Sequence, residues 1–196
     1  MSSEIRIHFE GDDALKPGFD SFFRTLHHLA RSKRYRFRVV ASRSGSEACA
    51  DFDAAMRTRP DAWNILLIDS EGPYESHLVA LLCRKYRWNK SAAASIFWMV
   101  EMMEAWFHAD KDALAGFYGQ GFNTAALSGN PNVELISKKD LERGLREATK
   151  KTRKGDYLRN KTDHAAQLLA TIDPDLVRKA APNCDRLFTA VLAQLS

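Results

Sequence analysis

Two acidic residues, Asp69 and Glu71, directly follow a short apolar segment at residues 65–68. Four consecutive apolar residues between polar flanks are typical of a strand buried on both faces of a sheet. Gly72-Pro73 then forces a turn, which places both carboxylates at the C-terminal end of a central strand. Ligands of open α/β sheets bind there, and two hard oxygen donors suit Mg²⁺ or Mn²⁺. The alternative is that both acids cap the next helix, whose first turn favours negative charge.

Further acidic residues follow two other predicted strands. Glu10 ends the alternating segment at residues 5–9, and Glu101 and Glu104 follow the segment at 95–100. If these strands are parallel, all of these carboxylates emerge at one edge of the sheet. Glu101 and Glu104 stand three residues apart in a helix predicted over 101–109, so they would share one face with His108. Glu104 is then either a metal ligand or an acid that favours the helix N-terminus, and His108 is better explained as solvated.

The elements that position these residues alternate between strand and helix. Strands are predicted at residues 5–9, 36–41, 65–68 and 95–100, with an edge strand at 133–136. Helices are predicted at 19–32, 47–57, 78–86, 101–109 and about 138–151, and the tail contains two more that begin near Pro174 and Pro182. This order predicts an α/β fold, with a mostly parallel sheet flanked by helices. We expect an α/β domain over residues 1–150, followed by a basic linker and a helical extension at 151–196 that packs on it.

Composition narrows the class of protein. The chain has 196 residues, of which 45% are hydrophobic and 28% charged, so it can bury one full core. No apolar run approaches the ~20 residues of a membrane span, and no signal peptide is recognisable. Three distant cysteines indicate a reducing cytoplasm. The sequence lacks the phosphate-binding, dinucleotide-binding and nucleophile-elbow motifs, so nothing indicates that it hydrolyses ATP alone.

Two basic segments stand out against the net charge of +4. The segment at 150–161 contains six cations and one acid, and the second cluster comprises Arg31, Lys33, Arg34, Arg36 and Arg38. Each is either a solvated charge run or a phosphate-contacting surface, with Tyr157 available to stack on a base. If both segments face the acidic edge, that surface would attract a polyanion.

The spacing of the acids resembles the Toprim domain of topoisomerases, primases and OLD-family nucleases. In that domain a Glu after one strand and an Asp-x-Asp after a later strand hold Mg²⁺ together. Glu10 matches the first element and Asp69 the leading Asp. Glu71 stands where the second Asp would be, which is a conservative departure.

A longer resemblance covers most of the chain. The segment MVEMMEAWFHADKDALAGFYG at 99–119 resembles a bacterial Toprim-like family of unknown function, as does the tail in which Tyr157, Lys161 and His164 precede IDPDLVRKAAPNCDRL. Members of that family are typically encoded beside AAA or ABC-type ATPases, similar to anti-phage ATPase–nuclease pairs. The resemblance implies that Glu10, Asp69, Glu71 and Glu104 are the metal and catalytic residues. It also implies that Lys161 and His164 contact phosphate or support the site.

These observations lead to one expected function and two alternatives. We expect a cytoplasmic, Mg²⁺- or Mn²⁺-dependent nuclease that acts on DNA or tRNA as the effector of an ATPase in phage defence, without membrane contact. Glu10 would ligate the metal or act as general base, and Lys161 would neutralise the phosphate. The first alternative is a non-catalytic interaction subunit of an ATPase complex. The second is a phosphotransferase or phosphatase acting on small nucleotides through the same metals.

Overall fold

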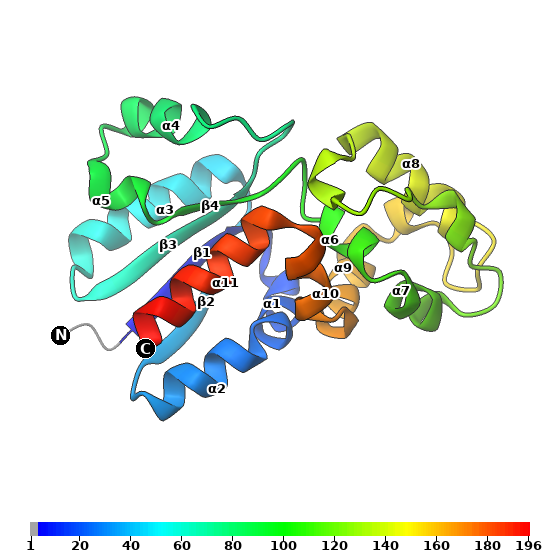
Figure 1. The fold of residues 1–196 in the computed structure, drawn as a ribbon, viewed down its shortest axis with the longest axis horizontal. Helices are drawn as coiled ribbons and strands as arrows, with labels where there is room; N and C mark the ends of the chain where they lie inside the picture. The colour runs from blue at the N-terminus through cyan, green and yellow to red at the C-terminus, as the bar shows by residue number, and fades with distance from the viewer. Residues whose placement is uncertain (1–3) are drawn as a thin grey trace.

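Four parallel strands form one sheet in the computed structural model, which describes residues 4–196 (Figure 1). The strands lie in the order β2-β1-β3-β4, and their bounds are Glu4–Glu10 (β1), Arg36–Ser42 (β2), Ala62–Asp69 (β3) and Ile96–Met99 (β4). β1 is central and pairs in parallel with β2 over seven residues, from Glu4 opposite Arg36 to Glu10 opposite Ser42. The predicted α/β fold with a parallel sheet is confirmed.

The apolar segment of β3 is buried on both faces, as its composition predicts. Ile65 and Leu67 pack in a core that also contains Ile5, Ile7 and Phe9 of β1. Leu66 and Ile68 pack in a second core on the opposite face of the sheet, with Phe52 of the helix that follows β2. All four side chains are at most 5% exposed. A continuous apolar run, rather than an alternating one, is what a strand between two helical layers requires.

Helices cover both faces of this sheet. α3 (Gly45–Thr58), α4 (Leu78–Tyr86) and α5 (Lys90–Ala93) lie on one face, and α1 (Lys16–Phe22), α2 (Arg24–Ser32) and α11 (Pro182–Leu195) lie on the other (Figure 1). The second layer is closed by the C-terminal tail, because α11 packs on both β4 and α2.

The remaining helices form a lobe beyond the C-terminal ends of the strands (Figure 1). This lobe contains α6 (Ala105–Ala109), α7 (Lys111–Tyr118), α8 (Lys138–Thr149), α9 (Lys161–Thr171) and α10 (Pro174–Ala180). α9 packs closely on α1, where a side chain at Gly18 would come within 2.5 Å of the Ala166 carbonyl oxygen. Within residues 4–196, no helix is long and apolar enough to cross a membrane.

Short 3₁₀ turns connect several of these elements. They lie at Asp13–Leu15 (η1), Thr124–Ala126 (η2), Val133–Leu135 (η3) and Tyr157–Arg159 (η4). The edge strand predicted at 133–136 is therefore wrong. The Asn132 side chain accepts a hydrogen bond from the Glu134 backbone N–H and closes a turn there, and Glu134 is buried against the start of α11.

The helix predicted over 19–32 is two helices. The chain leaves helical geometry at Phe23 (φ −90°, ψ 15°), between α1 and α2. The break allows the adjacent rings of Phe22 and Phe23 both to pack in the core, each against Phe188 of α11. Neighbouring positions on one regular helix would point about 100° apart, so a single straight helix would bury them less well.

Candidate functional site

Glu10 and Asp69 lie side by side where the central strands β1 and β3 end. The Asp69 backbone N–H donates a hydrogen bond to Glu10 Oε2 over 3.3 Å. Gly45, in the first turn of the 14-residue helix α3, faces the same carboxylate, and a Cβ there would lie 2.9 Å from Glu10 Oε2. Glu10 therefore sits against the positive end of a helix dipole, which favours its negative charge.

The Asp69 carboxylate is oriented by the backbone of the next connection. Its Oδ1 accepts a hydrogen bond from the Met103 N–H at 3.0 Å, while the residue remains partly accessible to solvent. The pKa of Asp69 is raised well above its ordinary value, first by burial among protein atoms and then by the charges of Glu104, Glu10 and Glu71. The carboxylates predicted to converge at this edge therefore act on one another in the structure.

Glu104 is held from the far end of the chain. It is 1% exposed, and its Oε1 accepts a hydrogen bond from the Tyr157 hydroxyl at 2.7 Å and lies 2.8 Å from Lys161 Nζ. Tyr157 is fully buried, and burial together with Glu104 raises its pKa well above the ordinary value, so it remains a hydrogen-bond donor. A buried ring cannot stack on a nucleic-acid base, which excludes that option for Tyr157.

Lys138 holds the two remaining acids of this edge. Its backbone N–H donates to Glu101 Oε2 at 2.8 Å, and its Nζ lies 2.5 Å from Glu71 Oε2. The Glu71 hydrogen bond is the main reason that the pKa of Lys138 is raised. Glu71 is exposed, so its ion pair with Lys138 lies at the protein surface. Glu101 is buried, so its hydrogen bond with the Lys138 backbone is shielded from solvent.

The expectation that Glu101, Glu104 and His108 share one helical face is wrong. Glu101 adopts a left-handed conformation (φ 63°) that a helix cannot contain, and α6 begins at Ala105. Glu101 consequently points to α8 and Glu104 to the tail. His108 is not solvated either: it is 2% exposed, packs against Gly144 of α8, and burial lowers its pKa to about 4.

The helix-capping alternative for Asp69 and Glu71 also fails. α4 begins at Leu78, after His77, with no side-chain cap, and Asp69 instead bonds to Met103. Glu71, like Glu101, has a positive φ (57°), so both connections contain a conformation that costs a non-glycine residue on the order of 1 kcal/mol. Such conformations cluster at functional sites, because the surrounding structure must hold them in place.

Ser70 ties these two strained connections together. Its Oγ accepts a hydrogen bond from the Glu101 N–H at 2.8 Å and donates to the Gly72 carbonyl oxygen at 2.5 Å. The loops after β3 and β4 are therefore fixed relative to each other. This fixed arrangement holds Asp69 at the end of β3 and Glu101 in the connection after β4.

The carboxylates provide the right atoms for Mg²⁺ or Mn²⁺, in a specific arrangement. No three Asp, Glu, His or Cys side chains in the part of the chain from 4 to 196 already form a metal-binding group. Lysines neutralise Glu71 and Glu104, which leaves Glu10 and Asp69 as the adjacent pair without a lysine partner among those residues. Mg²⁺ is commonly bound by one or two carboxylates, with waters and substrate phosphates completing its coordination. Glu10 and Asp69 fit that mode of binding.

The two basic segments have different positions. Lys161 reaches the acidic edge and keeps 48% of its side chain exposed. The cluster at Arg31–Arg38 instead surrounds the N-terminal end of β2, six residues from the end that faces Glu10. At about 3.3 Å per residue this is roughly 20 Å away, so the condition that both segments face the acidic edge is not met.

Lys138 and the hydrogen bond of Tyr157 to Glu104 were not predicted from the sequence. One signal pointed to Lys138: it lies in the first turn of α8, where positive charge is unfavourable beside the helix dipole. A lysine at such a position suggests an ion pair with a nearby acid, and Lys138 forms one with Glu71. Tyr157 carried no comparable signal, because its basic neighbours in the sequence suggest exposure.

Comparison with known proteins adds a family match. A family model described as a domain of unknown function (DUF4276) matches residues 12–192. No curated protein and no solved structure matches the chain. The match covers all of the site residues described above except Glu10.

Proposed function

The chain belongs to the DUF4276 family of domains of unknown function. We propose, from the geometry of the site, that the protein is a metal-dependent phosphodiester hydrolase. The observation that carries this proposal is the pair formed by Glu10 and Asp69 at the carboxyl ends of β1 and β3, where burial and then the neighbouring acids raise the pKa of Asp69. Two adjacent carboxylates that form no ion pair with a lysine within residues 4–196 favour a cation. The resemblance of the same acids to the Toprim pattern supports a divalent metal.

In this proposal each group at the edge has a distinct task. Glu10 and Asp69 hold Mg²⁺ or Mn²⁺, which would supply positive charge at the scissile phosphate and polarise a water molecule. The Met103 N–H fixes the direction of Asp69. Lys161, half exposed beside the buried Glu104, presents an ammonium group that would bind a substrate phosphate oxygen.

The cations beside Glu71 and Glu104 suggest how substrate would enter. Lys138 and Lys161 are each paired with an acid of the site, and both ion pairs reach the surface. A phosphodiester arriving there competes for the same ammonium groups. We therefore propose that Glu71 and Glu104 are released towards the metal when phosphate takes their lysines.

The resemblance to proteins encoded beside ATPases supports a cytoplasmic partner that supplies ATP hydrolysis. The chain itself has no Walker-type phosphate loop. We propose that an AAA or ABC-type ATPase subunit is that partner, in phage defence, and that the substrate is DNA or tRNA. Cleavage assays with and without the ATPase test this directly.

The experiment is a cleavage assay with supercoiled plasmid and total tRNA in Mg²⁺ or Mn²⁺. We expect wild type to cut one of the two polymers, and Asp69→Asn and Glu10→Gln each to lose the activity. Asp61→Asn is the matched control, since Asp61 is exposed just before the opposite end of β3. Cleavage that persists in Asp69→Asn would remove the site assignment, and cleavage of small nucleotides alone would favour a phosphatase or phosphotransferase.

A second candidate function rests on the two lysine pairs. Because Lys138 and Lys161 already neutralise two of the acids, the edge could be a structural ion-pair network within a non-catalytic subunit of an ATPase complex. A metal site should raise the melting temperature of wild type in Mg²⁺ or Mn²⁺, and Asp69→Asn should abolish the gain. Intact polymers together with folded, metal-insensitive protein would favour this second function.

A further inference from the structure

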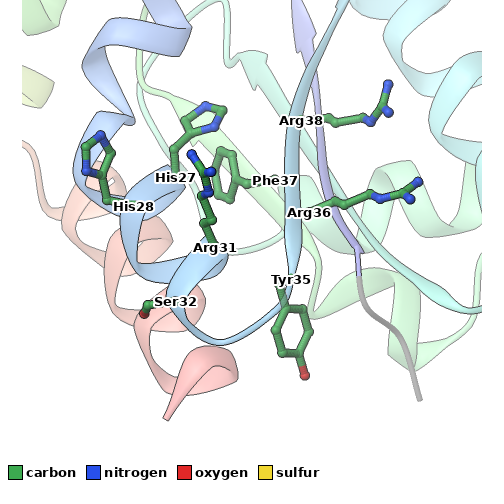
Figure 2. Close-up of a pocket in the computed structure, with 8 residues that line it drawn as sticks. All are labelled: His27, His28, Arg31, Ser32, Tyr35, Arg36, Phe37 and Arg38. Atoms are coloured by element: carbon green, nitrogen blue, oxygen red, sulfur yellow. The ribbon is translucent and has the colours of Figure 1, made fainter.

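We propose that a groove beside the N-terminal half of β2 binds the phosphate backbone of a nucleic acid, at a surface separate from the carboxylates. The groove has a volume of about 910 Å³ and is lined by α2, by the start of β2 and by the turn between them (Figure 2). We call it the basic groove, because its lining includes the three arginines Arg31, Arg36 and Arg38.

Side chains, and not the backbone of β2, form this surface. Phe37 is 9% exposed and Val39 is 2% exposed, so apolar side chains close the protein interior behind the groove. Figure 2 shows Arg31 of α2 on one side of β2, and Arg36 and Arg38 extending from the other. All three arginines are exposed. The groove therefore presents guanidinium groups to a ligand that arrives from solvent.

The arginines of the basic groove outnumber the acids that pair with them. Glu4 Oε1 lies 3.0 Å from Arg38 Nε and 3.0 Å from Arg6 Nη1, so two guanidinium groups share one carboxylate. Arg31 and Arg36 form no ion pair with any residue from 4 to 196. An anionic ligand would supply the negative charge that these two side chains lack.

The fold by itself explains only part of this positive charge. The C-terminal end of α2 favours cations through the helix dipole, which accounts for Arg31, Lys33 and Arg34. Arg36 and Arg38 lie outside that helix, on one face of β2, and lysine is the more usual residue for guarding an outer strand. Four of the five cations between residues 31 and 38 are instead arginines, whose planar group can form two parallel hydrogen bonds with a phosphate.

Arg34 occupies a position at which glycine would be more stable. α2 ends with hydrogen bonds from the Arg34 N–H to the Arg31 carbonyl oxygen at 3.0 Å, and from the Tyr35 N–H to the Ala30 carbonyl oxygen at 2.8 Å. This helix ending requires a left-handed residue, and Arg34 has a φ of 62°. Glycine adopts that conformation without the steric cost of a Cβ. The arginine thus costs stability, and it places a further exposed cation at the turn that leads into the groove.

Other anionic partners fit the basic groove less well than a nucleic acid does. A membrane surface would be expected to take up apolar side chains together with the cations. Within residues 4–196, the exposed large apolar side chains lie outside the groove, at Tyr74, Leu81, Leu135 and Leu176. An acidic protein would bind best around a central aromatic or aliphatic anchor, and Phe37 is already buried by its own chain.

A nucleic-acid backbone needs only exposed cations at a suitable spacing. Arg36 and Arg38 are two residues apart, which is about 6.6 Å along a strand. Two successive phosphate steps along one strand of a DNA duplex advance by about 6.8 Å. The two arginines can therefore follow alternate phosphates of one strand, while Arg31 adds a third contact from α2.

Acidic residues separate the basic groove from the carboxylate site. A second groove, of about 510 Å³, lies at the C-terminal end of β2, and its lining includes one cation, Arg43, and four acids, Asp12, Asp13, Glu47 and Asp51. A polyanion that followed β2 from the basic groove towards Glu10 would be repelled there. If the carboxylates cut nucleic acid, as proposed above, the basic groove holds a different segment from the one being cut.

The test is a binding measurement in EDTA, so that no metal reaches Glu10 and Asp69. Fluorescence anisotropy would follow a labelled DNA duplex and an RNA duplex of equal length over a series of salt concentrations. Arg31→Gln/Arg36→Gln removes two phosphate contacts, so the slope of log affinity against log salt should fall by about 1.8, which corresponds to about 60-fold at 0.1 M salt. The duplex that wild type binds more tightly identifies the polymer.

Arg34→Gly separates a role in binding from a role in folding. This variant should have a higher melting temperature than wild type, because glycine relieves the left-handed strain. It should nevertheless bind the duplex about eightfold more weakly at 0.1 M salt, since one phosphate contact is lost. Unfolding cannot explain weaker binding by a more stable protein. Unchanged binding would show that Arg34 is not part of the surface that contacts phosphate.

Arg84→Gln/Lys90→Gln is the matched control, because it removes the same charge from exposed positions on α4 and α5, outside the groove. Its binding should equal that of wild type, and an equal loss in both double variants would overturn the proposal. Wild type that binds neither duplex would also overturn it, as would a polyglutamate peptide that competes as well as the duplex. Asp69→Asn should bind like wild type in EDTA, so a failed cleavage assay and a failed binding assay remain distinguishable.

Discussion

Removing the hydroxyl of Tyr157 should cost the protein measurable stability, because Glu104 depends on it. Glu104 is 1% exposed, and its two partners are the Tyr157 hydroxyl at 2.7 Å and Lys161 Nζ at 2.8 Å. A hydrogen bond to a charged group contributes about 1.5–3 kcal/mol, whereas the half-exposed lysine contributes about 0–1 kcal/mol. We therefore expect Tyr157→Phe to lower the free energy of unfolding by about 1.5–3 kcal/mol. For a chain of this length that corresponds to about 3–12 °C in melting temperature.

A double-mutant cycle tests the physical reason as well as the size of the effect. In Glu104→Gln the acceptor is neutral, so Tyr157→Phe should then cost only about 0.5–1.5 kcal/mol. Urea denaturation of the four proteins measures the difference, which we expect to be about 1 kcal/mol or more. Tyr118→Phe is the matched control, since Tyr118 is also buried but bonds to His164 Nδ1. If Tyr157→Phe and Glu104→Gln have additive effects on the free energy of unfolding, the hydrogen bond between the two side chains is not strengthened by the charge of Glu104.

Three further results are expected. Burial and neighbouring acids raise the pKa of Asp69, so the folded state disfavours the charged carboxylate and loses stability as the pH rises through that pKa. Without metal, Asp69→Asn should therefore have a higher melting temperature than wild type at pH 8 but not at pH 4. Equal melting temperatures at pH 8 would contradict this expectation. Burial lowers the pKa of His108 from 6.5 to about 4, so stability of about 3 kcal/mol is present above pH 6.5 and lost towards pH 4. His108→Leu should flatten that acid limb in urea titrations, whereas exposed His28→Leu should leave it unchanged. The two carboxylate oxygens of Glu134 accept hydrogen bonds from the backbone N–H and from Nδ2 of Asn183 at 2.7 and 2.8 Å. Glu134→Gln should lower the free energy of unfolding in urea by about 1–3 kcal/mol, because the amide has only one oxygen that can accept. An unchanged urea midpoint would show that these hydrogen bonds do not anchor α11.

The parts of the site that the sequence predicts are those set by local patterns. The apolar segment of β3 identifies a doubly covered strand, and parallel strands bring Glu10 and Asp69 to one edge. Both inferences need only the period of the apolar residues and the general geometry of α/β sheets.

What the sequence does not predict depends on backbone geometry and on distant partners. The left-handed conformation of Glu101 separates it from Glu104, and no residue type at 101 signals it. Tyr157 lies among lysines and arginines in the sequence, yet its ring is buried against Phe107 at a centroid distance of 6.0 Å. Only the packing of the whole lobe determines that burial. Local propensity cannot report a contact between residues 53 positions apart.

The bond between Glu104 and Tyr157 also bears on the order in which the protein is made. A ribosome synthesises Glu104 before Tyr157, and adding the 53 residues from 105 to 157 takes about 3–10 s at 5–20 residues per second. During that interval Glu10, Asp69 and Glu104 have been synthesised, but neither the phenol nor the ammonium group that holds Glu104 has been. Every nascent or prematurely terminated chain that ends before residue 157 thus lacks a finished edge. The site can therefore be completed only after the tail that contains Tyr157 and Lys161 has been translated.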